Sequence, residues 1–400
     1  MKYAEVTHRL SDLGGEKWTL HALAQKRQLA GHDVINMTIG EPDMPTPTAL
    51  VDVAVDAMRN GRTGYSSGRG EPALLDALAN RYTKSSGRPI TTDNILCWPG
   101  TQTALYGVMR GVAEAGDEVI VGDPMYATYE GVIAATGASM VAVPLKAEQQ
   151  FRMQANDIRP LITERTTAIF INSPHNPTGA ILTETDIVAI GELAIEHDLW
   201  IIADEVYEDM VFDEASFISP LQRAELANRV VVTSSISKSH AAAGFRSGWC
   251  VGPAEFCQRV LPLAETMLFG NQPFIADMTA AAIADYPDIA ADMRKRFAQR
   301  RDVLMNILNE VDGLKVNRPQ AGMFLLIDIA ATGMTGDAYA RKLLEETNVA
   351  VMPGTSFGNS LKTWIRLALT IDDEKTQEAG RRIASHLNKS MSLGSAPITG

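Results

Sequence analysis

A lysine that could bond to a carbonyl compound stands in the segment 234–249, directly after the apolar run 230–232. Lys238 is surrounded by serine, alanine and glycine residues and has no acidic neighbour for several positions on either side. Such a lysine suits covalent attachment of a carbonyl cofactor, with Ser235 and Arg246 binding the phosphate of that cofactor. A solvated loop between a strand and a helix is the alternative that this segment alone leaves open.

Two further segments could bind parts of the same cofactor. Gly100 and Thr101 follow an apolar run and open a helical stretch, so the amides of Thr101 and Gln102 and the helix dipole would attract a phosphate. Tyr126 follows the next apolar run, where its ring could lie flat against an aromatic ring. A helix cap and a core tyrosine are the ordinary structural explanations of these two segments.

Other polar residues sit at or near further apolar runs. Asn176 lies in a turn that two prolines and a glycine make rigid, which would point its amide at a ligand oxygen. Asp204 could keep a heteroaromatic nitrogen protonated and Tyr207 could donate to a phenolate oxygen, although an N-cap aspartate with a packed tyrosine fits equally. Arg366, in the middle of an apolar run, needs an anion, which a substrate carboxylate or a structural salt bridge would supply.

These residues must be positioned by a sheet whose strand ends meet at one edge. Short apolar runs alternate with helical stretches from residue 95 onwards, which predicts a mostly parallel, seven-stranded sheet with helices on both faces. Ligands of such sheets bind at the carboxyl ends of the strands. The expected strands are 95–98, 119–121, 140–143, 168–171, 200–203, 230–233 and 249–251.

A second, smaller α/β unit is expected near the C-terminus. After a nearly all-helical stretch, apolar runs again alternate with helical ones; the runs are 314–316, 324–329, 349–351 and 364–367. We therefore predict an N-terminal segment 1–45 that contributes to the small domain, a large cofactor-binding domain 46–290 and a small domain 291–400. The tail from Ser390, rich in serine, glycine and proline, is expected to be mobile.

The composition argues against several classes of function. The formal net charge of −12 disfavours nucleic acid or an anionic membrane as a partner. Cys97, Cys250 and Cys257 have neither the even number of a disulfide framework nor metal-ligand spacing, so no metal is expected. The N-terminus lacks an apolar signal core and no apolar run reaches membrane-spanning length, so the expected location is the cytoplasm.

The combination of these residues resembles the active site of the class I aminotransferases, the pyridoxal-phosphate enzymes of fold type I. The resemblance extends from about residue 35 to residue 370, and the series is far more specific than any single motif in it. The residues that carry it are Gly40, Tyr65, Gly100, Thr101, Tyr126, Asn176, Asp204, Tyr207, Ser235, Lys238, Arg246 and Arg366.

The resemblance implies how the cofactor ring is bound. Lys238 would bond covalently to pyridoxal 5'-phosphate and then move the proton of the substrate. Asp204 would pair with the pyridine nitrogen and make the ring an electron sink. Tyr207 and Asn176 would bind the ring oxygen O3', and Tyr126 would stack on the ring.

The resemblance also implies how the phosphate and the substrate are held. Four residues would bind the phosphate: Thr101, Ser235, Arg246 and, from the other subunit of a homodimer with shared active sites, Tyr65. Arg366, Asn176 and the Gly40 amide would clamp the α-carboxylate of the substrate. The implied activity is reversible transfer of an amino group between an L-amino acid and a 2-oxo acid by a ping-pong route.

Substrate preference is where the sequence departs from the common pattern. In the aspartate-using bacterial branch, a lysine for the distal carboxylate of the substrate often stands where this chain has the neutral Gln102. The segment around Glu16, Trp18 and His21 also lacks the usual Ser/Thr pattern. The chain is most similar to arginine:pyruvate transaminases, which predicts arginine and pyruvate as substrates.

Three alternatives remain open at this point. One is an aspartate or aromatic aminotransferase that uses 2-oxoglutarate, and another is a lyase of the same fold that cleaves a carbon–sulfur bond. The third is a non-catalytic binding module that keeps the fold. This last alternative predicts the loss of at least one key residue, and none is lost here.

Overall fold

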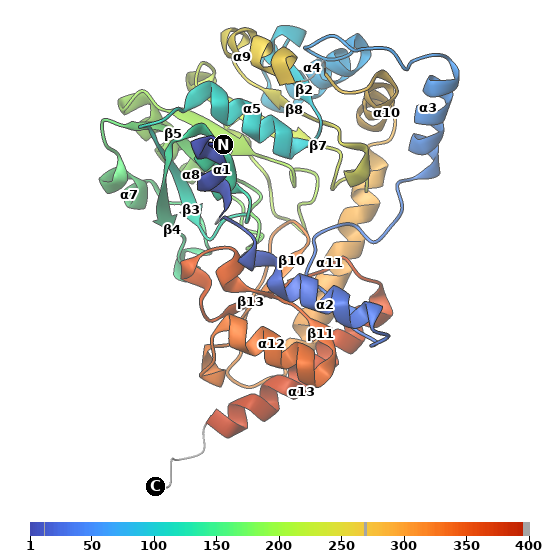
Figure 1. The fold of residues 1–400 in the computed structure, drawn as a ribbon, viewed down its shortest axis with the longest axis vertical. Coiled ribbons are helices and arrows are strands. Elements are labelled where there is room, and N and C mark those ends of the chain that lie inside the picture. The colour runs from blue at the N-terminus through green and yellow to red at the C-terminus, as the bar shows by residue number, and fades with distance from the viewer. Residues whose placement is uncertain (12, 268–269, 395–400) are drawn as a thin grey trace.

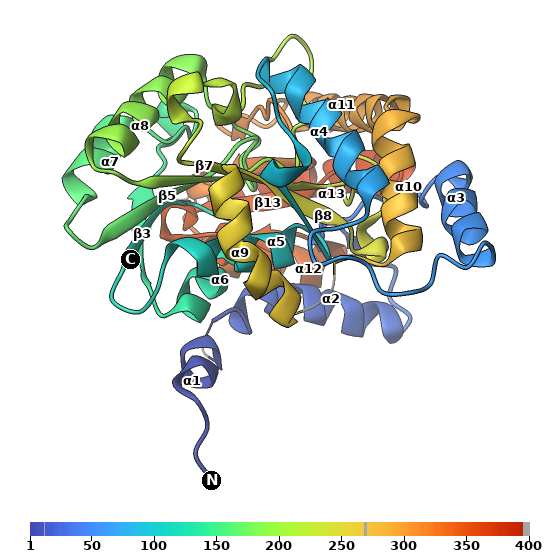
Figure 2. The same ribbon diagram turned by 90° about the horizontal axis from the view of Figure 1, so that it is seen from above.

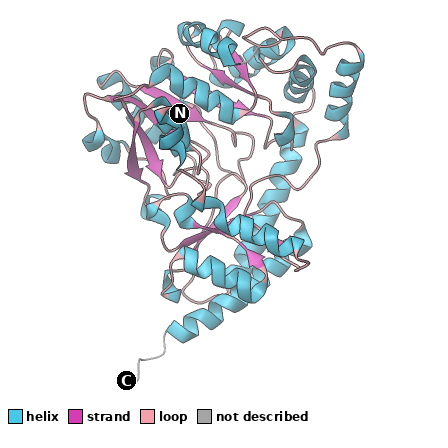
Figure 3. Ribbon diagram, viewed as in Figure 1, coloured by secondary structure: helices cyan, strands magenta, loops and turns pink. Residues whose placement is uncertain are grey.

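Two sheets, each covered by helices, make up the part of the chain that the computed structural model describes, residues 1–11, 13–267 and 270–394 (Figures 1 and 3). Seven strands form the larger sheet and four form the smaller one, and a third, two-stranded pairing joins distant parts of the chain. Within the described residues, no helix is both long and apolar enough to cross a membrane.

The seven-stranded sheet has the strand order β2-β8-β7-β6-β5-β3-β4. Its strands are β2 (Ile95–Trp98), β3 (Glu118–Asp123), β4 (Ser139–Pro144), β5 (Thr166–Asn172), β6 (Trp200–Asp204), β7 (Val230–Ser235) and β8 (Gly248–Val251). Only β8 runs antiparallel to its neighbours β2 and β7, while the other pairs are parallel. The prediction of a mostly parallel, seven-stranded sheet is confirmed.

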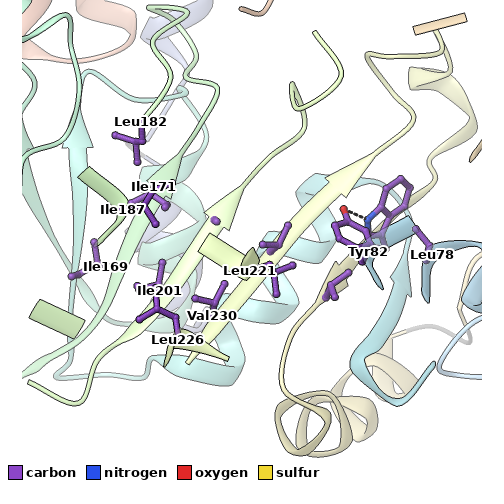
Figure 4. Packing of buried hydrophobic residues seen from close by; sticks show 14 of the residues in the cluster. Leu78, Tyr82, Ile169, Ile171, Leu182, Ile187, Ile201, Leu221, Leu226 and Val230 are labelled. Carbon is purple, nitrogen blue, oxygen red and sulfur yellow. Dashed lines mark hydrogen bonds between the residues drawn. The ribbon is translucent and has the colours of Figure 1, made fainter. Parts of the chain in front are cut away.

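Helices cover both faces of this sheet, which explains why its strands are continuous apolar runs. Successive side chains of a strand point to opposite faces, so Ile201 belongs to one buried cluster and Ile202 to the other. One face is covered by α4 (Pro72–Ser86), α8 (Glu184–Glu196) and α10 (Pro273–Ala284), and the other by α5 (Thr101–Val112), α6 (Tyr129–Thr136) and α9 (Ala254–Met267) (Figure 2). Figure 4 shows part of the first cluster, in which Ile201, Val230 and Leu226 lie close together.

The four-stranded sheet is antiparallel, in the order β12-β13-β10-β9. Its strands are β9 (Lys315–Asn317), β10 (Phe324–Asp328), β12 (Met352–Pro353) and β13 (Trp364–Ala368), and its helices are α11 (Asp288–Leu308), α12 (Gly336–Thr347) and α13 (Asp373–Gly394). Strand β1 (Ile35–Asn36) pairs in parallel with β11 (Val349–Ala350), so the N-terminal segment with α2 (Thr19–Leu29) lies against this unit. The predicted domain bounds themselves stay a prediction.

The remaining helices are α1 (Glu5–Ser11), α3 (Thr48–Arg59) and the short α7 (Ala155–Ile158). The expected mobility of the tail from Ser390 is wrong for its first residues, because α13 continues to Gly394. Ser390 is buried and Met391 packs against the core of the smaller unit, so apolar contact outweighs the weak helix propensity of serine. Residues 395–400 of that tail lie outside the described residues.

Candidate active site

A cavity of about 420 Å³ lies where the carboxyl ends of the parallel strands face the four-stranded sheet. All but two of the predicted site residues line it: Gly40, Thr101, Gln102, Tyr126, Asn176, Asp204, Tyr207, Ser235, Lys238, Arg246 and Arg366. Strand register explains part of this convergence, because β5 and β6 place Asn172 opposite Asp204, and β6 and β7 place Asp204 opposite Thr233. The parallel sheet thus gathers residues that are far apart in the sequence.

Gly100 and Tyr65 are the two predicted residues that do not line the cavity. Gly100 has φ +82°, and a Cβ at this position would lie 2.3 Å from Nη2 of Arg246. Only glycine therefore lets the start of α5 approach the guanidinium so closely. Tyr65 lies in the loop between α3 and α4 with 92% of its surface exposed, away from the cavity of its own chain.

Lys238 follows β7 and reaches the cavity from the large sheet. Its Nζ donates a hydrogen bond to the Gly40 carbonyl oxygen at 2.8 Å. Burial lowers the pKa of this amine to about 8; the Glu41 carboxylate opposes that effect and the Arg246 guanidinium reinforces it. A lysine with a pKa near 8 keeps a substantial neutral, nucleophilic fraction at neutral pH, which suits attack on a carbonyl carbon.

Asp204 ends β6 and is only 3% exposed. Its Oδ2 accepts a hydrogen bond from the Tyr129 hydroxyl at 2.7 Å and its Oδ1 accepts one from the Val206 amide at 3.2 Å. Burial raises the pKa of this carboxyl to about 6, while both hydrogen bonds favour the ionised form. Tyr129 was not among the residues predicted from the sequence, where no local pattern separates it from a core tyrosine.

Tyr207 and Asn176 are hydrogen-bonded to each other within the cavity. The backbone amide of Asn176 donates to Oδ1 of Asn172 at 2.8 Å, which fixes the turn that carries Asn176. Burial raises the pKa of Tyr207 well above its ordinary value, so the phenol keeps its proton and stays a hydrogen-bond donor. The pair therefore offers two donors to an oxygen of a ligand.

Hydrogen-bond donors suited to an anion lie close together at the start of α5. The hydroxyl of Thr101 is buried and has no hydrogen-bond partner among the described residues. Ser235, at the end of β7, is also buried, and Arg246 adopts φ +52°, which turns its side chain toward the start of α5. A helix N-terminus, two hydroxyls and a guanidinium together form a phosphate-binding arrangement.

Arg366 approaches the cavity from β13 of the small sheet and is 2% exposed. Its guanidinium carbon lies 4.1 Å from the ring centre of Phe324 and 4.3 Å from that of Phe357. It donates to the Thr38 carbonyl oxygen and, at 3.4 Å, to Oδ1 of Asn176, but Nε has no partner within the described residues. No carboxylate of the described chain pairs with it, so a structural salt bridge does not explain this arginine, and a bound carboxylate would complete it.

The residues present fit pyridoxal phosphate. Buried donors without partners stand at both ends of the cavity, Thr101 Oγ1 near the phosphate-binding arrangement and Arg366 Nε near the small sheet. Between them lie an amine, a carboxylate and the ring of Tyr126. This arrangement suits an aromatic aldehyde that carries a phosphate, together with a second, carboxylate-bearing molecule. No cluster of three or more side chains suited to a metal ion occurs among residues 1–11, 13–267 and 270–394.

Comparisons with known proteins agree with this chemistry. Residues 32–383 match the model of the family "Aminotransferase class I and II". The chain is 41% identical over 385 residues to the arginine–pyruvate transaminase AruH of Pseudomonas aeruginosa, which covers 96% of this chain and 98% of that protein. It is 32% identical to a probable aspartate/prephenate aminotransferase of Aquifex aeolicus, covering 93% and 95% of the two chains.

Solved structures show the same fold. The aspartate aminotransferase of Thermus thermophilus with maleate superposes with a TM-score of 0.90 at 28% identity, covering 96% of this chain and 99% of that one. The aromatic aminotransferase of Pyrococcus horikoshii gives a TM-score of 0.86 at 30% identity, covering 92% and 99%. From family match, fold and cavity together, the chain belongs to the class I and II aminotransferases and is a pyridoxal-phosphate-dependent transaminase.

Proposed function

We propose that this transaminase uses Lys238 as its covalent attachment point and proton carrier, and that arginine and pyruvate are its amino donor and acceptor. Bound pyridoxal phosphate supplies an aldehyde carbon for attachment and a ring that withdraws electrons from the substrate Cα. Lys238 Nζ would accept and return the proton of that Cα. The Asp204 carboxylate would keep a proton on the ring nitrogen, which requires the acid to remain ionised.

The other side chains of the cavity would bind and orient. Tyr207 and Asn176 would donate hydrogen bonds to the ring oxygen, and Tyr126 would lie against the ring. The phosphate would be held by Arg246, Ser235, Thr101 and the amides at the start of α5, those of Thr101 and Gln102. We further propose a homodimer in which Tyr65 serves the phosphate of the other subunit, as the class I resemblance implies.

Arg366 would receive the α-carboxylate of both the amino donor and the oxo acceptor, with Asn176 and the Gly40 amide. Because this carboxylate is common to all substrates, Arg366→Ala is expected to raise KM for amino acids and oxo acids alike by about 100-fold. The measurement is steady-state kinetics with each substrate varied in turn. Arg366→Lys keeps the charge but not the two-pronged geometry and should recover only part of the loss. A purely structural arginine would instead lower Tm and leave both KM values unchanged.

The charged residues that line the cavity and have no role in the steps above favour an amino donor with a cationic side chain. Among the lining residues that the structure describes, the cations are Lys238, Arg246 and Arg366, and each already has a role above. The acids are Asp204, which serves the ring, and Glu41, which has no such role. The presence of Glu41 is therefore the observation on which the substrate proposal rests. Among the described lining residues, Glu41 could bind the distal guanidinium of a donor, whereas no further cation could bind a distal carboxylate.

Two neutral residues with no other role proposed for their side chains also line the cavity. Gln102 lines it, and its Oε1 accepts a hydrogen bond from Thr128 Oγ1 at 2.9 Å. The indole of Trp18 is also part of the lining, and an indole face is the best aromatic partner for a guanidinium. Both residues suit a long cationic donor better than aspartate, in agreement with the substrates named for the relative from P. aeruginosa.

A donor and acceptor panel on the purified holoenzyme tests this proposal. We expect arginine with pyruvate to be turned over faster than aspartate with 2-oxoglutarate, and the reverse order would contradict it. Glu41→Gln, which keeps the shape and removes the charge, should lower kcat/KM for arginine roughly tenfold and leave alanine nearly unaffected. An equal loss for both donors would mean that Glu41 acts on Lys238 and not on the substrate side chain.

A further inference from the structure

The turn 204–209 after β6 presents side chains in two directions. Asp204 and Tyr207 line the cavity, whereas Glu205 and Glu208 do not line it. Glu205 is 1% exposed, and the Glu208 side chain is also largely covered. The turn therefore places two acids on the side away from the cofactor, in a region whose contacts the proposed reaction does not use.

The Glu208 carboxylate is held by three side chains from two elements. Its Oε1 accepts hydrogen bonds from Ser234 Oγ on β7 at 2.8 Å and from the Tyr82 hydroxyl on α4 at 3.3 Å. Arg81 Nη2, also on α4, lies 3.2 Å from the same oxygen. Tyr82 in turn accepts a hydrogen bond from Trp249 Nε1 on β8 at 2.9 Å, the dashed line in Figure 4. One carboxylate thus connects the turn to a helix and to two strands of the sheet.

Neighbouring acids are bound differently. Asp209 meets the same Arg81 Nη2 at 3.0 Å, but among the described residues it forms no hydrogen bond with Ser234 or Tyr82, and its side chain is more exposed than that of Glu208. Glu205 Oε1 accepts from Ser219 Oγ at 2.6 Å, while its Oε2 has no partner among the described residues. Burial, followed by the charge of Glu208, raises the pKa of Glu205 well above its ordinary value, and burial also raises the pKa of Glu208, an effect that the Arg81 guanidinium opposes. Of the two buried acids turned away from the cavity, Glu208 is therefore the one that the network holds by ion pair and hydrogen bonds.

The backbone transmits these contacts to the cavity side. The Glu208 amide donates to the Glu205 carbonyl oxygen at 2.8 Å, and the Glu205 amide donates to Thr233 O at 2.9 Å. Asn172 Nδ2 donates to the Asp204 carbonyl oxygen at 2.9 Å. Tyr207 directly precedes Glu208, and the Glu208 amide is bonded to Glu205, the neighbour of Asp204. A displacement of Glu208 would therefore move Tyr207 and, through Glu205, Asp204.

We propose that Glu208 is a positioning residue for amino transfer, because its contacts with Arg81, Tyr82 and Ser234 fix the turn that presents Asp204 and Tyr207 to the cofactor. This inference rests on the roles proposed above for Asp204 and Tyr207. In that proposal Asp204 and Tyr207 serve the ring of the cofactor, whereas Arg366 binds the α-carboxylate of the substrate. We therefore expect loss of Glu208 to act more strongly on turnover and on the bound cofactor than on substrate affinity.

The test is Glu208→Gln in the holoenzyme, with the matched control Asp209→Asn, which also removes a carboxylate from Arg81. The first readout is the pH midpoint of the visible absorption of the bound cofactor, measured without substrate. A weaker hydrogen bond from Tyr207 to the ring oxygen moves this midpoint upward. We expect an upward shift and a fall in kcat of roughly tenfold for Glu208→Gln with little change in KM, and no change for Asp209→Asn.

An unchanged midpoint and kcat in Glu208→Gln, with only a lower Tm, would overturn the inference. If Glu208→Gln does not fold, Ser234→Ala decides, because it removes one hydrogen bond and leaves the ion pair intact; a shifted midpoint supports the proposal and an unchanged one overturns it. Tyr207→Phe, measured in parallel, tests the proposed role of Tyr207 separately from that of the Glu208 contacts. Should Tyr207→Phe itself leave midpoint and kcat unchanged, the proposed role of Tyr207 fails, and not the network alone.

Discussion

Lys238→Ala abolishes amino transfer and the covalent attachment of pyridoxal phosphate; this is the largest effect we expect of any substitution. The variant loses both the nucleophile and the proton carrier, so the rate should fall by at least roughly 10⁴-fold. The phosphate-binding residues are untouched, and the cofactor should therefore still bind without a covalent bond. Absorption spectra before and after borohydride reduction, followed by peptide mass analysis, measure the attachment.

Lys238→Arg is the matched control for charge, since it keeps a cation but no nucleophilic amine at neutral pH. It should be as inactive as the alanine variant. In the wild type, attachment should become faster as the pH rises through about 8, because the neutral amine is the reactive form and burial sets its pKa there. Borohydride labelling of a different lysine in the wild type would contradict the proposal that Lys238 attaches the cofactor.

The second large effect is expected for Asp204. Asp204→Asn keeps the size of the side chain but removes the negative charge that would pair with the ring nitrogen, and Asp204→Ala removes the group altogether. Both variants should retain the cofactor through Lys238 and the phosphate-binding residues while transfer falls by about 10³-fold. Single-turnover kinetics with an amino acid donor, followed by the loss of the visible band, measure this step. An unchanged rate would contradict the proposal that Asp204 makes the ring an electron sink.

Tyr129→Phe provides a milder control for the same acid. The Tyr129 hydroxyl donates to Asp204 and favours its ionised form, so its loss raises the pKa of Asp204 above about 6. Because the reaction needs the ionised carboxylate, activity on the acid side of the pH profile should decline at a higher pH than in the wild type. Activity well above that pKa should change little.

The parts of the site that follow strands were predictable from the sequence. An apolar run long enough for a buried strand ends at a polar residue, and parallel strands bring these ends to one edge, so Asp204 and Lys238 could be expected to meet. The types of residue at the ends of these strands then indicated which reactions the site could support. The seven strands were found for the same reason, because burial on both faces leaves nearly unbroken apolar runs.

Other features depend on contacts that no local pattern shows. The predicted strand 349–351 is confirmed only for Val349 and Ala350, which pair with the N-terminal β1, and a separate strand that begins at Met352 and pairs with β13 was not predicted. The partner of Asp204, Tyr129, lies on a helix, where the direction of the side chain decides whether it points to the site or to the core. No pattern near Glu208 in the sequence indicates that Arg81 of α4 lies against its carboxylate.

The guanidinium of Arg366, stacked between Phe324 and Phe357, belongs to the four-stranded sheet, whereas the amine of Lys238 belongs to the seven-stranded one. In the proposed roles, a bound amino acid would have its carboxylate at the first group and its amino end near the second, so it would connect the two sheets. Substrate binding would then favour a closed arrangement of the two parts of the molecule, and product release would allow them to separate again.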